Sequence, residues 1–189
     1  MSHKWGYSDE DVFDVARDEM TSLINENKPF FLLIHTIDTH SDDKPNVGAE
    51  NKFNNVYYNN INNTSNQIYK FVKWIQNKSI YKDTTIIILG GHLRNSQMMK
   101  FPPQRKIYNL FINARHIPDN KKRTFTQIDL FPTILEALGA EIKGHKLGLG
   151  VSVFSDNKTL AEIYSRDELK NELSKKNKLY DRLIMNEYP

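Results

Sequence analysis

The fold class follows from one stretch of sequence, Thr84-Thr85-Ile86-Ile87-Ile88-Leu89-Gly90-Gly91-His92. Its run of β-branched and aliphatic residues is typical of a strand that is buried on both faces of a parallel sheet. A second such run, residues 30–37, follows Pro29 and leads into Asp38-Thr39-His40. We therefore expect two buried strands, each followed within a few residues by a histidine.

Helical periodicity recurs between and after these two runs. Apolar spacing and capping signals predict helices over 9–26, 61–75, 130–138 and 166–187, the last one opened by the capping box of Ser165 and Glu168. A third, shorter strand is predicted over 107–113, and the longest loop runs from Ser41 to about Asn60. Helices that alternate with strands predict an α/β layered fold, with a largely parallel sheet flanked by helices.

Several local interpretations accompany these elements. The helix over 130–138 is expected to begin at Asp129, and its core-facing residues are Phe131, Ile134, Leu135 and Leu138. The asparagines within 54–66 indicate a polar loop with no function of its own. The basic cluster 121–123 indicates a solvated turn. The apolar positions of the C-terminal helix favour docking on a surface.

Composition limits the functional classes. With 189 residues, of which 39% are hydrophobic, the chain is predicted to form a single domain over 1–189. The formal charge of +3 comes from 26 basic and 23 acidic residues that are scattered along the chain, which argues against nucleic-acid binding. The absence of cysteine excludes disulfides and thiolate metal sites. No apolar run approaches the ~20 residues that span a bilayer, so a soluble domain is expected.

The histidines that follow the two long strands are the best candidates for a site. Ligands of open α/β sheets bind at the carboxyl ends of the strands, so His40 and His92 are expected to lie at one edge. Two imidazoles there could ligate a divalent cation or hydrogen-bond a phosphate, and the alternative is that both are ordinary solvated loop residues. Asp38 is either a third ligand or a cap of its own turn. Arg94 and Lys100 either neutralise an anion or are simply exposed cations.

Five blocks of the sequence resemble, in order and spacing, successive blocks of the sulfatase-like alkaline phosphatase superfamily. They are Trp5-Gly6-Tyr7-Ser8-Asp9-Glu10-Asp11, Thr36-Ile37-Asp38-Thr39-His40, Thr85-Ile86-Ile87-Ile88-Leu89-Gly90-Gly91-His92-Leu93, Gln127-Ile128-Asp129-Leu130-Phe131-Pro132-Thr133-Ile134-Leu135 and Leu147-Gly148-Leu149-Gly150-Val151-Ser152-Val153-Phe154. The resemblance covers about residues 5–155 and implies the C-terminal part of an alkaline-phosphatase-like domain whose N-terminal half is missing.

Within that superfamily the chain looks most like the phosphoglycerol transferases, with lipoteichoic acid synthases and phosphoethanolamine transferases as more distant relatives. The Asp-Thr-His block, together with leucine after His92, favours this choice. The resemblance implies a divalent metal (Mn, Mg or Zn), a phospholipid head-group donor and a periplasmic or cell-surface glycan or polymer as acceptor. It also implies a phospho-enzyme on threonine or serine, and a parent protein that works in the periplasm or at the extracytoplasmic face of the membrane.

Carried over by position, His92 matches a metal ligand, and His40 matches a histidine that contacts the transferred phosphate or a second metal. Arg94 is assigned to the same phosphate site. Gly91 departs from the family, which has an aspartate ligand there, and losing that carboxylate should weaken a hard-cation site. The family's nucleophile and its glutamate ligand belong to blocks upstream of Trp5. We therefore expect no catalytic residue in this chain, a weak or absent metal site, and no activity in isolation.

Two alternatives to a transferase part remain. One is a degenerate, non-catalytic domain that binds an anionic glycan or a partner chain, and the other is part of a sulfatase or phosphodiester hydrolase. If strands of the family sheet are absent, the remaining sheet has an open edge, and open edges tend to pair with other chains. Self-association is therefore predicted as well.

Overall fold

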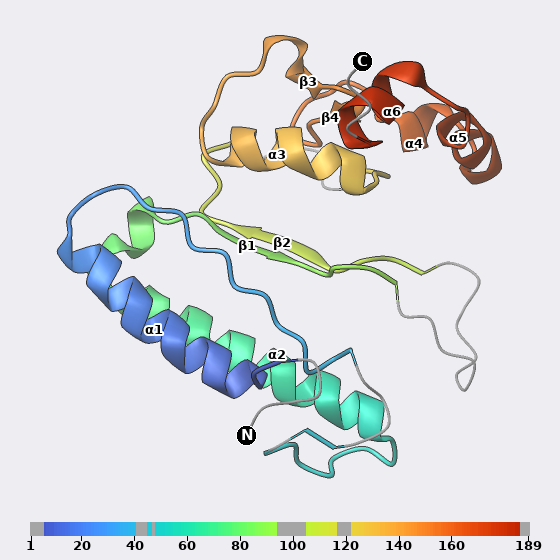
Figure 1. Ribbon diagram of the computed structural model, residues 1–189. Coiled ribbons are helices and arrows are strands. Elements are labelled where there is room, and N and C mark those ends of the chain that lie inside the picture. Colours follow the sequence, from blue (N-terminus) through green and yellow to red (C-terminus); the bar gives the residue numbers. More distant parts are fainter. Residues whose placement is uncertain (1–5, 41–44, 47, 94–104, 117–121, 186–189) are drawn as a thin grey trace. The chain divides into compact units, whose positions relative to one another are not determined.

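A computed structural model describes residues 6–40, 45–46, 48–93, 105–116 and 122–185 (Figure 1). The chain divides into two compact units, each described by itself below. The first comprises Met1–Thr84 and His92–Lys106, and the second comprises Thr85–Gly91 and Ile107–Pro189.

Two long helices that pack side by side form the first unit: α1 (Asp9–Asn25) and α2 (Val56–Gln76), the latter followed by the short 3-10 helix η1 (Ser79–Asp83) (Figure 1). The predicted first helix is confirmed, and Ser8 caps it by accepting a hydrogen bond from the N–H of Asp11. The core between the helices holds Phe13 and Phe71, whose ring centroids lie 5.1 Å apart.

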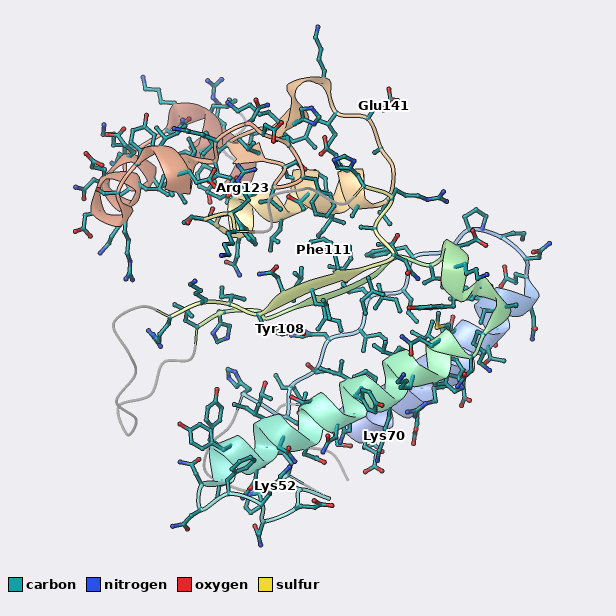
Figure 2. The ribbon with its side chains drawn as sticks, turned by 180° about the vertical axis from the view of Figure 1, so that it is seen from behind. Lys52, Lys70, Tyr108, Phe111, Arg123 and Glu141 are labelled. Atoms are coloured by element: carbon teal, nitrogen blue, oxygen red, sulfur yellow. The ribbon has the colours of Figure 1, made fainter. Side chains whose placement is uncertain are left out.

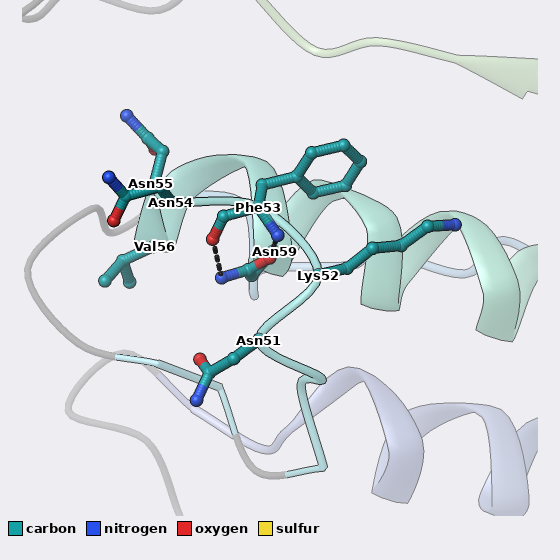
Figure 3. A pocket seen from close by; sticks show the side chains of 7 residues that line it. All are labelled: Asn51, Lys52, Phe53, Asn54, Asn55, Val56 and Asn59. Atoms are coloured by element: carbon teal, nitrogen blue, oxygen red, sulfur yellow. Dashed lines mark hydrogen bonds between the residues drawn. The ribbon is translucent and has the colours of Figure 1, made fainter.

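Helix α2 begins earlier than its apolar period predicts, and the polar-loop interpretation of 54–66 is wrong. The helix opens after Asn55, whose side chain accepts from the N–H of Tyr58. Asn59 accepts from the N–H of Phe53 and donates to the carbonyl of the same residue, on the rim of a shallow hollow (Figure 3). Asn60 is fully buried. Hydrogen bonds between the side chains of Asn55 and Asn59 and nearby backbone groups therefore offset the weak helix propensity of asparagine.

The strand predicted over 30–37 is not part of a sheet in the portion of the chain that the structure describes. Side chains there alternate between exposed and half-buried, and both Phe31 and Leu33 are 79% exposed. Alternation of this kind is the side-chain pattern of a strand with one open face. The prediction of a strand buried on both faces is therefore wrong, because no second backbone among the described residues pairs with this segment.

In the second unit, β1 (Ile86–Leu89) and β2 (Asn109–Ile112) form a two-stranded sheet. Both lie within predicted strands, but they pair antiparallel, with Ile86 opposite Ile112, so the expected parallel arrangement is not present among the described strands. Parallel pairing needs a long, usually helical crossover, and the described residues between the two strands contain no helix. On β2, the ring of Phe111, which is labelled in Figure 2, contacts the ring of Phe154 edge-on, with centroids 5.5 Å apart.

The next part of the second unit comprises η2 (Gln127–Asp129), α3 (Leu130–Ala137), η3 (Lys143–His145), β3 (Lys146–Leu147) and β4 (Gly150–Val151). The helix is where it was predicted, but its cap differs: Thr126 and Asp129 form a capping box, and Asp129 also accepts from the N–H of Val151 at 2.9 Å. The carboxylate of Asp129 therefore joins the helix start to β4.

The buried face of α3 also differs from the predicted one. Phe131 is 63% exposed and Leu138 is 49% exposed, whereas Thr133 is completely buried. The Thr133 hydroxyl donates to the carbonyl of Asp129 and accepts from the N–H of Val153. Hydrogen bonding to the strand region after β4 therefore decides which face of α3 points inward.

Three helices follow: α4 (Leu160–Ile163), α5 (Arg166–Leu173) and α6 (Lys178–Met185). The predicted capping box of Ser165 and Glu168 is confirmed. The single helix predicted over 166–187 is interrupted after Leu173, where Ser174 forms the C-cap of α5 and Asn177 begins a new helix.

Arg123 corrects the interpretation of 121–123 as a solvated turn. Its side chain (labelled in Figure 2) is only 10% exposed, and its guanidinium donates to both carboxylate oxygens of Glu162 at 2.7 Å. The same group donates to the carbonyls of Ser155 and Asn157. Arg123 therefore holds together three segments of the second unit, as planar bidentate arginine pairs do.

Candidate functional site

The two histidines singled out by the sequence lie next to each other in the first unit. The ring centroids of His40 and His92 are 6.1 Å apart, with an interplanar angle of 85°, and both side chains are exposed. Fifty-two positions separate them along the chain, so only the fold brings them together. Two accessible imidazoles at this spacing can approach the same small anion or cation from two sides.

A buried carboxylate fixes the backbone that leads to His40. One oxygen of Asp9, a fully buried residue, accepts from the N–H groups of Ile37 at 2.7 Å and Asp38 at 3.1 Å. The other oxygen accepts from the hydroxyl of Thr64 at 2.8 Å. The first turn of α1 and the middle of α2 therefore hold this segment from two sides.

The turn itself closes when the N–H of His40 donates to the carbonyl of Ile37 at 2.8 Å. Asn46 donates from its side chain to the carbonyl of Asp38 at 2.9 Å, and the N–H of Asn46 donates to the side-chain oxygen of Asn60 at 2.9 Å. Asp38 is 3% exposed, whereas His40 is exposed. The turn thus places the aspartate inward and the imidazole outward.

The ring of His92 is oriented by its own neighbour. Its Nδ1 lies 3.0 Å from the carbonyl oxygen of Leu93. A carbonyl only accepts, so Nδ1 carries the proton in this contact, and the lone pair of the neutral ring is then on Nε2. Fixing one ring nitrogen in this way is how proteins prepare the other for a metal.

Gly91 precedes His92 at the position where the resemblance leads us to expect an aspartate. It is exposed, and a Cβ added there would meet no atom of the described residues within 4 Å. The backbone therefore has room for the missing carboxylate, although glycine itself contributes no ligand. Gly90 has no such room, because a Cβ added there would lie 2.8 Å from Cγ2 of Ile107.

Donor atoms for a metal are too few among the residues that can be described. That part of the chain contains no cluster of three or more His, Cys, Asp or Glu side chains, whereas a catalytic zinc takes three protein ligands. The described residues alone therefore do not fit a complete metal centre. Arg94, the second candidate for the phosphate site, and Lys100, either a cation that neutralises an anion or a simply exposed one, lie outside the described residues.

Sequence reasoning missed the residues that hold the site. By its position, Asp9 is one of the acids in the first turn of the helix predicted over 9–26, and Asn46 and Asn60 fall within the predicted loop from Ser41 to about Asn60. Nothing in their local pattern distinguishes a buried hydrogen-bonding residue from a solvated one. The single available signal was that Asp9 belongs to the first of the five resembling blocks.

Comparison with known proteins agrees with these blocks. A family profile described as Sulfatase matches residues 2–140. Phosphoglycerol transferase I of Salmonella arizonae is 25% identical over an alignment of 172 residues, which covers 85% of this chain and 22% of that protein. The chain thus spans about a fifth of the length of this curated relative. No solved structure matches.

Two further findings bear on the site. Among the described residues, no helix combines the length and the apolar character that crossing a bilayer requires. Members of the sulfatase family have an alkaline-phosphatase-like fold and are typically metal-dependent. The Sulfatase profile covers well over half of this chain, and the chain therefore belongs to the sulfatase family.

Proposed function

We propose that this domain supplies the phosphate-binding histidine and one histidine metal ligand of a phospho-alcohol transfer centre, and that it is inactive on its own. The main support for the proposal is that the ring centroids of His40 and His92 lie 6.1 Å apart. The likeness to a phosphoglycerol transferase supports it. In this proposal the donor is a phospholipid head group, the acceptor is a glycan or polymer hydroxyl, and the parent protein works in the cell envelope.

Each histidine has a distinct role. His40 donates a hydrogen bond to a phosphoryl oxygen, from a position that Asp9 fixes through the backbone of Ile37 and Asp38. His92 offers Nε2 to a divalent cation, because its Nδ1 faces the carbonyl of Leu93. Such a cation, when bound, polarises a phosphoryl oxygen.

Metal titration by calorimetry tests the proposal. Manganese and zinc should bind weakly to the natural chain and not at all to His92→Ala. Gly91→Asp should bind at least ~10-fold more tightly, because it adds an anionic oxygen where the backbone has room. Gly91→Asn is the matched control, since it has the same shape without the charge, and it should bind like the natural chain. Equal metal binding by the natural chain and His92→Ala, or no binding by Gly91→Asp, would refute the proposed ligand.

A second candidate function is a non-catalytic domain that binds an anionic glycan or a partner chain. Gly91 favours it, because the expected carboxylate is absent and the described residues form no three-residue metal cluster. Glycan binding that persists in His92→Ala would support this reading. Metal-dependent hydrolysis of a phosphodiester would exclude it and would favour the hydrolase alternative.

We also propose that the chain self-associates. The exposed side chains of Phe31 and Leu33 support this, because they lie on a segment that has no sheet partner among the described residues. Light scattering at increasing concentration should show dimers or larger species, and Phe31→Ser/Leu33→Ser should reduce them. A monomer over the whole concentration range would contradict the proposal.

A further inference from the structure

The last helix of the second unit exposes its apolar face. In α6, Leu179, Tyr180, Leu183 and Ile184 are 61–65% exposed (α6 is labelled in Figure 1). Their spacing places all four on one side of the helix. On the other side, Asp181 is half-buried. Lys178 and Arg182 are exposed as well, so α6 does not turn its apolar side toward a core as a surface helix of a globular protein does.

The helix has its own start signal and a basic surround. The side-chain oxygen of Asn177 accepts from the N–H groups of Leu179 at 2.9 Å and Tyr180 at 3.1 Å, which caps the first turn. Lys175 is paired with Glu172, but residues 176–184 contain three further basic side chains and one acidic one, so this segment carries a net charge of +2. The three basic residues are Lys176, Lys178 and Arg182, and all of them are exposed.

Charge decides which kind of surface suits this face. A symmetric pair of copies would bring the same basic patch together twice, and like charges would repel. A neutral apolar partner would leave the lysines without any role. An anionic bilayer offers both partners at once, since acyl chains accept the apolar side chains and phosphodiester head groups pair with the cations.

We propose that α6 is an interfacial helix that docks on anionic phospholipid bilayers. Leu179, Tyr180, Leu183 and Ile184 enter the boundary between head groups and acyl chains, and Lys176, Lys178 and Arg182 lie along the phosphates. The helix lies on the membrane and does not cross it, because an eight-residue helix is much shorter than the ~20 residues that a span needs. This inference uses neither His40 nor His92.

Vesicle co-sedimentation of the full chain tests the proposal. The chain should bind vesicles that contain roughly one third phosphatidylglycerol in phosphatidylcholine, and binding should weaken with salt. Lys176→Gln/Lys178→Gln should lower the partition coefficient about 30-fold, at about 1 kcal/mol per cation and 1.4 kcal/mol per factor of ten. The matched control Lys70→Gln/Lys82→Gln removes the same charge from exposed positions of the first unit and should change it less than about two-fold.

Insertion is tested separately. At saturating vesicle concentration, Ile184→Trp should show a blue shift of its fluorescence, whereas Arg182→Trp, on the polar side, should not. Equal binding to pure phosphatidylcholine, equal losses in the two lysine pairs, or equal tryptophan spectra would each overturn the proposal. The proposal would also be overturned if the chain did not bind vesicles. Dimers in light scattering that Leu183→Ser disrupts would then identify a second copy of the chain as the partner of this face. His92→Ala should bind vesicles normally, so failure of the metal site and failure of this inference can be told apart.

Discussion

The ion pair between Arg123 and Glu162 allows a quantitative prediction for Glu162→Gln. Hydrogen bonds from Arg123 lower the pKa of Glu162 from 4.5 to about 2, and the N–H groups of Thr159 and Thr124 add to the effect. One pKa unit corresponds to about 1.4 kcal/mol, so the full difference amounts to about 3 kcal/mol. The Glu162 side chain is 20% exposed, and solvent screening reduces this. We therefore expect Glu162→Gln to lower the free energy of unfolding by about 2 kcal/mol at pH 7.

The effect should depend on pH in one direction. Because the folded pKa lies below the unfolded value, the contribution is fully present above pH 4.5 and is lost as pH falls toward about 2. The difference between the natural chain and Glu162→Gln should therefore shrink to less than half by about pH 3. Urea unfolding followed by circular dichroism at a series of pH values measures it.

A matched control lies nearby. Glu172 pairs with Lys175 at 2.6 Å, but the two side chains are 55% and 67% exposed. Exposed pairs contribute little, so Glu172→Gln should change the unfolding free energy by less than about 0.5 kcal/mol. The reasoning fails if Glu162→Gln resembles this control, or if its effect is the same at pH 7 and about pH 3.

Two further substitutions test the packing of the chain. Asp9→Asn keeps an oxygen for the N–H groups of Ile37 and Asp38 but removes the charge, so the free energy of unfolding should fall by about 1–2 kcal/mol. Urea unfolding monitored by Trp74 fluorescence measures this change. An unchanged urea midpoint would contradict the role of this carboxylate. Gly150→Ala should destabilise by about 3 kcal/mol or more, because its Cβ would overlap the carbonyl of Ile128, whereas Gly91→Ala should stay within about 0.5 kcal/mol. Thermal denaturation compares the two glycine variants, and equal melting temperatures would refute the packing argument.

Local patterns were enough for the helices with clear signals. The apolar period and Ser8 located α1, and the pair Ser165 and Glu168 located the start of α5. Capping involves residues three apart, so the sequence contains all the information it needs. The position of β1 could also be predicted from the sequence, because its run of aliphatic residues is continuous.

Long-range hydrogen bonds account for most of what the patterns missed. Asn60 and Asp9 are polar residues that local patterns assign to the surface, but distant backbone and hydroxyl groups pair with them and make burial favourable. Arg123 was missed for the same reason, because its side chain, which is 10% exposed, pairs with Glu162, 39 positions away in the chain. The antiparallel pairing of β1 and β2 was missed too, since an aliphatic run does not specify the direction of the strand beside it.

The sequence by itself determined the family, the positions of most elements and the two candidate histidines, because these depend on residue identity and short spacing. Only the tertiary structure decided that His40 and His92 lie 6.1 Å apart, that Gly91 has room for a side chain, and that α6 presents its apolar face to solvent. Those facts depend on which distant groups the folded chain brings into contact, and local spacing carries no record of such contacts.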